Sequence, residues 1–218
     1  MATKPGFPAE GGCTCRSVRY RIATEPLFVH CCHCRWCQRE TGSAFAINAL
    51  IESSRVEVLS GQPEPVVTPS NSGRGQTIVR CPQCRIALWS HYAGGGPAFS
   101  FVRVGTLDNP DLLPPDIHIF TSSKQPWVIL PPDVPAAAEY YDRNAHWPPQ
   151  SLERRRVLLA VLAANQNEAP ALASGAPGDR PVAEPDVRCA RTNHRIACTA
   201  VRLLPYAALA RRMQRGPV

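Results

Sequence analysis

The chain has 218 residues, 44% of them hydrophobic and 19% charged, which is enough for one packed domain and a remainder. No stretch approaches the roughly 18 to 20 apolar residues of a membrane-spanning helix, and residues 1–10 lack the apolar run of a secretory signal. We therefore expect a cytoplasmic protein with no membrane partner. Residues 1–148 carry 13 basic and 12 acidic side chains, whereas residues 149–218 carry 11 and 5, so only the C-terminal part is basic enough to contact nucleic acid.

Short runs of alternating or β-branched residues, separated by Gly and Pro turns, predict a mainly β domain over residues 1–148. We expect two or three small antiparallel sheets in this domain. The predicted strands cover residues 17–22, 45–51, 56–59, 77–79, 87–91, 100–104, 118–120 and 127–130.

One amphipathic helix is predicted over residues 149–165. The Ser151 hydroxyl can cap its first turn, and Leu152, Leu159 and Leu162 oppose three consecutive arginines. Residues 166–218 are rich in Pro, Ala and Arg and have little to bury, so we expect a disordered linker followed by a basic tail.

Eight of the ten cysteines lie in three tight groups, which favours metal binding over disulfides in a reducing cytosol. Short spacings such as Cys-x-Cys and Cys-x-x-Cys aim two thiolates to one side of a tight turn, and zinc takes four ligands tetrahedrally. The groups are Cys13-Thr14-Cys15, then Cys31-Cys32-His33-Cys34-Arg35-Trp36-Cys37, and finally Cys81-Pro82-Gln83-Cys84.

The first and last groups predict a structural zinc site. Cys81 and Cys84 form half of a zinc knuckle, and Cys13 and Cys15 supply the missing thiolates if the two turns lie side by side. A closed four-cysteine site stabilises the fold by coupling metal binding to folding. The alternative interpretation is two unrelated thiol pairs.

The middle group predicts a second zinc with an open position. If Cys32, Cys34 and Cys37 are its ligands, the fourth position is free for water or substrate, which is typical of a reactive site. Cys31 or His33 could instead close the site. Neighbouring residues of an extended segment face opposite ways, so a shared face for Cys32 and Cys34 turns Cys31 and His33 away.

The sequence resembles the glutathione-dependent formaldehyde-activating enzyme family, also called the centromere-protein-V/Gfa domain family. The resemblance covers about residues 10–130 and rests on cysteines and short motifs in the family's order. The matching segments are Gly11-Gly12-Cys13-Thr14-Cys15, Val18-Arg19-Tyr20, Cys32-His33-Cys34-Arg35-Trp36-Cys37-Gln38-Arg39-Glu40-Thr41-Gly42, Cys81-Pro82-Gln83-Cys84, Gly105-Thr106-Leu107-Asp108, His118-Ile119-Phe120 and Trp127.

This resemblance implies an Mss4-like fold of small antiparallel sheets held by zinc, with two zincs per chain at the two sites described above. The family's named activity is the condensation of formaldehyde with glutathione, classed as a carbon–sulfur lyase reaction. The chain departs from the family where Arg16 and Arg85 replace glycines after the structural cysteines. A non-glycine residue there would adopt a positive φ at a cost of about 1 kcal/mol or more.

We therefore expect a zinc-dependent lyase whose partners are a small-molecule thiol and an aldehyde, with the second zinc binding the thiolate. Three protein thiolates leave zinc with a net charge of −1, which makes it a poor Lewis acid for a carbonyl. Arg39 is the candidate for attracting a carboxylate of the thiol, although a solvated surface charge is the plainer interpretation. The alternative function is a non-catalytic zinc-held module that uses the basic tail to contact protein or nucleic acid.

Overall fold

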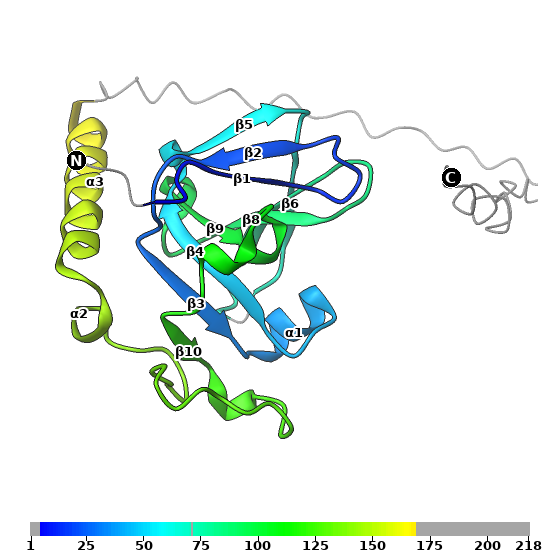
Figure 1. Cartoon of the computed structure of the whole chain (residues 1–218). Helices are drawn as coiled ribbons and strands as arrows, with labels where there is room; N and C mark the ends of the chain where they lie inside the picture. Colours follow the sequence, from blue (N-terminus) through cyan, green and yellow to red (C-terminus); the bar gives the residue numbers. More distant parts are fainter. Residues whose placement is uncertain (1–4, 71, 169–218) are drawn as a thin grey trace, which may run out of the picture. The chain divides into compact units, whose positions relative to one another are not determined.

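Two β-sheets form the body of the computed structural model, which describes residues 5–70 and 72–168 (Figure 1). The smaller sheet is antiparallel, with the order β1 (Ala9–Gly12), β2 (Arg19–Ile22), β5 (Val56–Ser60). The larger sheet has the order β10 (Ile117–Ile119), β3 (Phe28–Cys32), β4 (Ala46–Glu52), β9 (Phe99–Arg103), β8 (Ala87–Tyr92), β7 (Gln76–Arg80), β6 (Glu64–Thr68). Its strands are antiparallel except for the parallel pair β10 and β3.

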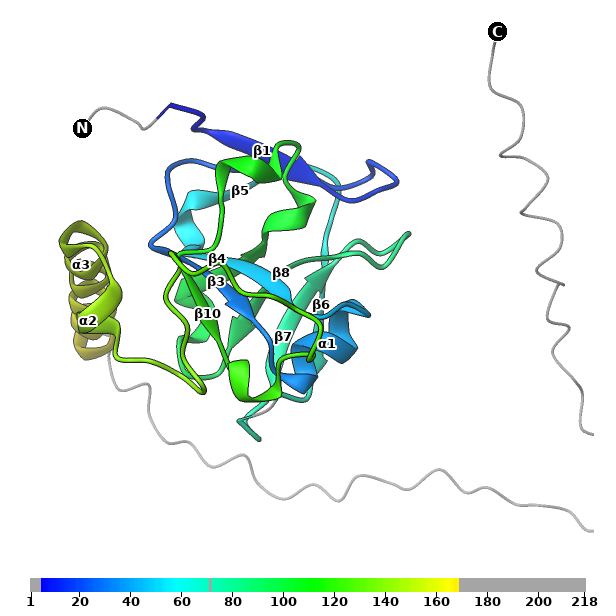
Figure 2. The same ribbon diagram turned by 60° about the horizontal axis from the view of Figure 1, so that its bottom comes forward.

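Three helices accompany the sheets: α1 (Arg35–Thr41), α2 (Arg143–His146) and α3 (Pro149–Glu168). Figure 2 shows α1 following the end of β3, with β10 beside that strand. Single 3₁₀ turns lie at Ser53–Arg55, Gly96–Ala98, Val104–Thr106, Pro110–Leu112 and Thr121–Ser123. None of the described helices combines the length and apolar character of a membrane span.

The two sheets bury a common apolar core between them. Tyr20 and Ile22 of the smaller sheet lie in one cluster with Val29, Ile51 and Val102 of the larger sheet. The Tyr20 hydroxyl, fully enclosed, makes a hydrogen bond of 2.7 Å with the Thr106 hydroxyl, which satisfies the polar end of this ring.

The opposite face of the larger sheet carries a second cluster. Successive side chains of a strand point to opposite faces, so Phe28 and Cys32 of β3 turn away from the core that contains Val29. Phe28 and Cys32 pack with Leu50 and Trp147. Leu152 and Leu158 of helix α3 pack against the edge of this cluster. This second face therefore holds Cys32, Cys34 and Cys37.

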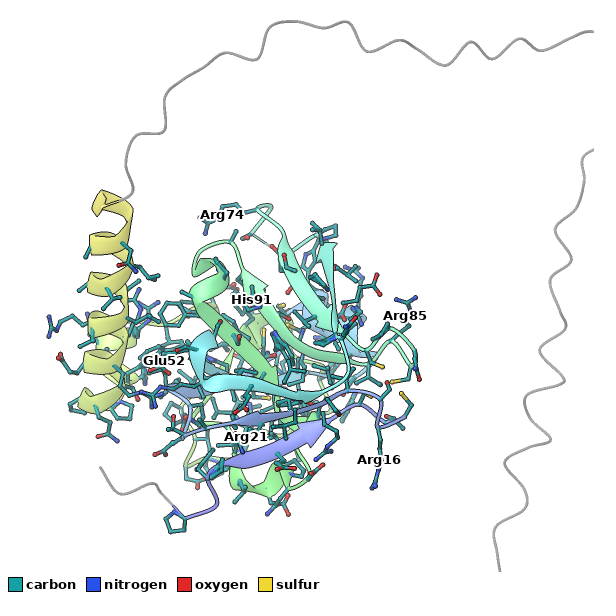
Figure 3. The ribbon with its side chains drawn as sticks, turned by 90° about the horizontal axis from the view of Figure 1, so that it is seen from above. Arg16, Arg21, Glu52, Arg74, Arg85 and His91 are labelled. Atoms are coloured by element: carbon teal, nitrogen blue, oxygen red, sulfur yellow. The ribbon has the colours of Figure 1, made fainter. Side chains whose placement is uncertain are left out.

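Helix α3 does not turn all of its arginines away from the sheet, as the predicted amphipathic pattern required. The Arg154 guanidinium points inward and binds the buried Glu52 carboxylate through two hydrogen bonds of 2.9 and 2.5 Å. Figure 3 shows Glu52 directed from β4 toward this helix. The helix also begins before Ser151, because the Pro148 carbonyl already accepts its first hydrogen bonds and proline fits the first helical position.

The mainly β class predicted from the sequence is confirmed. Seven predicted strands are present with bounds shifted by at most two residues, while strands β1, β3 and β6 were not predicted. The strand predicted over residues 127–130 is wrong: prolines at 126, 131 and 132 flank the segment, which pairs with no strand, and Trp127 and Ile129 are exposed. The predicted linker and tail lie outside the described residues, apart from the end of α3.

Candidate metal centre

The first and last cysteine groups meet, although 66 positions separate Cys15 from Cys81. The four sulfurs of Cys13, Cys15, Cys81 and Cys84 all lie within 4.8 Å of one another. Cys15 Sγ is 3.4 Å from Cys13 Sγ and 3.6 Å from Cys81 Sγ. Tetrahedral zinc with bonds of about 2.3 Å separates its sulfurs by about 3.8 Å, so these four residues fit a zinc ion.

Hydrogen bonds favour the thiolate form at two of these four cysteines, whereas burial raises the pKa of the Cys84 thiol. The Ser17 hydroxyl lies 3.1 Å from both Cys15 Sγ and Cys81 Sγ. Its contact lowers the pKa of the Cys15 thiol. Burial raises the pKa of Cys81, but hydrogen bonds from Ser17 and from the backbone N–H groups of Cys84 and Gln83 outweigh burial and lower it to about 6. Metal ligation requires deprotonated sulfur, so Cys15 and Cys81 are the members of this group best prepared to bind a cation.

Both knuckle turns hold an arginine in the left-handed region. Arg16 and Arg85 each have a φ of 62°, as the substitution of glycine by arginine predicted. In each turn the arginine N–H donates to the carbonyl of the first cysteine, Cys13 or Cys81, at 3.0 Å. Figure 3 shows the two arginines at neighbouring turns, close to the sulfurs. Each turn therefore keeps its shape at the cost of backbone strain.

Replacing Arg16 or Arg85 with glycine is expected to raise the free energy of unfolding by about 1 kcal/mol at each position. Glycine adopts this φ without strain, and the exposed ion pair between Arg85 and Glu64 contributes little. Chemical denaturation of the zinc-loaded chain measures the effect. Arg21→Gly, in the extended strand β2, is the control and should destabilise the chain; a similar loss for Arg16→Gly would contradict the strain argument.

The middle group brings three buried sulfurs together at the junction of β3 and α1. Cys32 ends β3, Cys34 is the residue that caps α1, and Cys37 lies in its first turn, where its N–H donates to Cys34 Sγ at 3.4 Å. The three ligand atoms lie within 4.8 Å of one another, and no fourth Cys, His, Asp or Glu of the described chain joins them. This set fits a metal ion with one open position.

Hydrogen bonds among the three thiols shift their pKa values in opposite directions. Hydrogen bonds from the Cys32 and Cys37 thiols, aided by the backbone N–H groups of Cys37 and Trp36, lower the pKa of Cys34 to about 2. The same sharing raises the pKa of Cys32 far above its ordinary value. A metal ion bound by these three sulfurs would displace the protons that they share.

Cys31 and His33 lie apart from these three sulfurs, in another group. His33 Nε2 is 3.6 Å from Cys31 Sγ and 3.0 Å from His118 Nδ1, and all three side chains are buried. His118 belongs to β10 and lies opposite Cys31 in the pairing of β10 with β3, which brings the three side chains together. Burial lowers the pKa of His33 to about 4, which leaves this ring neutral at pH 7.

A cavity of about 640 Å³ lies against the three sulfurs, within the size range of small-molecule sites. Cys32, Cys34 and Cys37 form part of its wall, and Arg103 is its most deeply buried arginine. Arg39 lies exposed on α1 and is not among the residues that line the cavity, so its contact with substrate stays a prediction. Seven aromatic side chains complete the wall: Trp36, Tyr92, Phe99, Phe101, Phe120, Tyr140 and Trp147.

Gln38 holds helix α1, which carries Cys37, against the segment that follows β10. Its amide Nε2 donates to the carbonyls of His33 at 2.6 Å and Ser123 at 2.9 Å. Its Oε1 accepts from Arg35 Nη1 at 2.8 Å and from Gln125 Nε2 at 3.0 Å. A buried amide with all of these partners holds Cys34 and Cys37 in place.

Sequence reasoning missed three buried polar residues on the cavity side, His30, Asn48 and Arg103. None belongs to a spaced motif, and their proximity depends on strand register rather than on local sequence. The available signal was polarity inside otherwise apolar strands, such as Arg103 in the predicted strand at residues 100–104.

The chain matches one known protein family over the residues that carry both cysteine sets. A sequence model of the family described as "Glutathione-dependent formaldehyde-activating enzyme" matches residues 8–123, which include both cysteine sets. A crystal structure of a Rhodobacter sphaeroides protein is similar at 21% identity over 59% of this chain and 99% of that chain, with a TM-score of 0.38. No curated protein matched the chain. Because the matched residues make up more than half of its length, the chain belongs to the glutathione-dependent formaldehyde-activating enzyme family.

Proposed function

We propose that the chain is a zinc-dependent enzyme of the carbon–sulfur lyase type that acts on adducts of a small thiol and an aldehyde, such as S-hydroxymethylglutathione. The observation that supports this proposal most is the incomplete set of three buried cysteines on the wall of a substrate-sized cavity. The four-cysteine set, by contrast, is complete and lies outside the cavity wall. We assign one zinc to each set: a reactive zinc to the three-cysteine set and a structural zinc to the four-cysteine set.

At the reactive set, the residues of the chain would hold the ion and shape its surroundings. A zinc ion held by Cys32, Cys34 and Cys37 supplies an open position that keeps a substrate thiol in its thiolate form. The aromatic wall excludes water around that position, and Gln38 keeps the ligand helix oriented. The cysteines must stay reduced for this role, as in the cytoplasm where we place the enzyme.

The proposal is tested by proton-exchange NMR on the zinc-loaded chain with glutathione and formaldehyde. We expect the enzyme to accelerate the interconversion of free and adducted glutathione over the rate in buffer with the same free zinc. A rate equal to that of the buffer, for a folded chain that holds its metal, would remove the lyase activity and leave only the metal sites.

A further inference from the structure

Several arginines line the cavity, and only one acidic side chain accompanies them. The arginines are Arg74, Arg103, Arg143 and Arg155. The acidic side chain among the described lining residues is Glu40, and it is already paired with Arg80. A cleft that is lined by charge of one sign concentrates ions of the opposite sign, so this cavity attracts an anionic ligand.

Arg143 and Arg155 lie on helices that follow the family-matched residues. The family match ends at residue 123, whereas Arg143 belongs to α2 and Arg155 to α3, which α2 leads into (Figure 1). Both side chains are half-buried and line the cavity. Neither guanidinium forms an ion pair or a hydrogen bond with another described residue. These two cations therefore have no counter-ion within the described part of the chain.

Contacts of α2 and α3 hold the two guanidinium groups at the cavity. The Arg143 guanidinium lies over the Trp147 ring, 5.3 Å from its centre. Its Nε is enclosed, so its terminal nitrogens are the donors that a ligand can reach. Arg155 follows Arg154, whose ion pair with Glu52 anchors α3 on the sheet. Burial lowers the pKa of Arg155 and the positive charge of Arg143 lowers it further, because the two cations are near each other.

Two neighbouring cations without a counter-ion form an incomplete site. Like charges repel each other, and burial strengthens this repulsion because it limits screening by water. A carboxylate that accepted hydrogen bonds from both guanidinium groups would remove the repulsion. The next residue of α3 is a contrast: Arg156 is exposed and already paired with Glu153 through two hydrogen bonds of 2.7 Å. The helix therefore presents Arg155, but not Arg156, for an anion in the cavity.

A buried polar row connects these arginines to the three sulfurs. The row consists of His30, Asn48 and Arg103, side by side on β3, β4 and β9. The Tyr141 hydroxyl lies 2.7 Å from His30 Nε2 and accepts a hydrogen bond of 2.7 Å from Nε1 of Trp147, the ring beneath Arg143. Cys32 lies two residues, or about 7 Å, beyond His30 on the same face of β3. An extended tripeptide spans roughly 10 Å, so a thiol of that size can contact both the sulfurs and the arginines.

Building on the proposed function, we propose that Arg143 and Arg155, on helices outside the family-matched residues, form the site that binds a carboxylate of the thiol substrate. The carboxylate accepts hydrogen bonds from the guanidinium groups while the sulfur of the same molecule lies at the three-cysteine set. Arg39 was the candidate for this role from the sequence, but Arg143 and Arg155 line the cavity and Arg39 does not. The C-terminal helices thus select thiols that carry a negative charge.

Calorimetry with glutathione on the zinc-loaded full chain tests this site without turnover. We expect the Kd to rise about 10- to 100-fold in the Arg143→Gln/Arg155→Gln double variant, because charge-assisted hydrogen bonds to the carboxylate are lost. Arg156→Gln is the matched control and should keep the Kd of the unaltered chain, since Arg156 pairs with Glu153 on the exposed side of α3. Metal analysis and circular dichroism accompany each titration. An unchanged Kd in the double variant would overturn the assignment.

A second measurement uses the unaltered chain, in case the double variant does not fold. Glutathione diethyl ester keeps the thiol but lacks both carboxylates, so it should bind at least about 10-fold more weakly than glutathione. In the double variant the two compounds should bind with nearly equal Kd, because the site that distinguishes them is gone. Equal affinities in the unaltered chain would overturn the carboxylate site.

Turnover separates this inference from the proposed function. In the NMR exchange assay the double variant should show a KM for glutathione that rises about as much as the Kd, while kcat at saturating glutathione stays within about twofold. Turnover with an unchanged KM in the double variant would defeat this inference alone. Glutathione binding that depends on the two arginines, without any turnover, would defeat the proposed function instead.

Discussion

The Cys34→Ser chain is expected to bind about one zinc ion where the unaltered chain binds about two, and to lose lyase activity while staying folded. Cys34 caps α1 and is one of three ligands in its set, and no other Cys, His, Asp or Glu of the described chain joins that set. The serine hydroxyl can still accept the hydrogen bond from the Cys37 N–H, which preserves the helix start. Metal analysis, circular dichroism and the NMR exchange assay measure the three effects.

Cys31→Ser is the matched control for this prediction. It removes a buried sulfur three positions away, on the side of β3 that faces His33 and His118. We expect this variant to keep both zinc ions and its activity. Loss of a zinc ion in Cys31→Ser, together with an unchanged metal content in Cys34→Ser, would show that the wrong sulfurs were assigned to the reactive set.

Local pattern was enough to predict most of the strands and both cysteine sets. A strand such as β4 alternates apolar residues from Phe45 to Ile51, and a knuckle such as Cys81 to Cys84 is a tight turn whose geometry depends on a few consecutive residues. The positive φ of Arg16 and Arg85 was predicted from the glycines that the resembled family has at these two positions. The strands and each single cysteine turn need no knowledge of distant contacts, whereas the pairing of the two turns was predicted from the four ligands that a closed zinc site needs.

Features that depend on both faces of the sheet were harder to predict. Strand β3, Phe28–Cys32, is buried on both faces, so it shows no alternation between apolar and polar residues. The contact of Asn48 with Arg103 joins residues 55 positions apart and exists only because β4 and β9 pair in one register. The sequence contains no local signal for that register, and so the polar row beside the reactive sulfurs became visible only in the structure.

The orientation of Arg154 in α3 was also hard to predict, because its partner is distant in the sequence. Arg154 looks like part of a solvated charged face, because Arg155 and Arg156 follow it directly. The partner that draws it inward is Glu52, a buried carboxylate on β4 that is 102 positions away. A buried acid must be paired, so Glu52 determines which arginine faces the sheet.

The Cys84→Ser chain is expected to lose far more stability than the Cys34→Ser chain, although both replace one sulfur by one oxygen. The four-cysteine set joins the turn after β1 to the turn between β7 and β8, so a metal ion bound there would tie the two sheets together. Zinc binding contributes about 10 to 16 kcal/mol in small zinc peptides, whereas whole domains are stable by about 5 to 15 kcal/mol. Even a partial loss of that coupling is therefore large enough to unfold the domain.

Thermal and chemical denaturation with metal analysis would measure this difference directly. We expect Cys84→Ser to retain less than the full structural zinc and to lose its cooperative transition or shift it by several kcal/mol. Treating the unaltered chain with a strong zinc chelator should have the same effect, because it removes the same link between the sheets. If Cys84→Ser unfolded no more easily than Cys34→Ser, the contact between the two turns would be held by packing alone. In that case the buried core around Tyr20 and Val102, rather than the four sulfurs, would be what keeps the smaller sheet on the larger one.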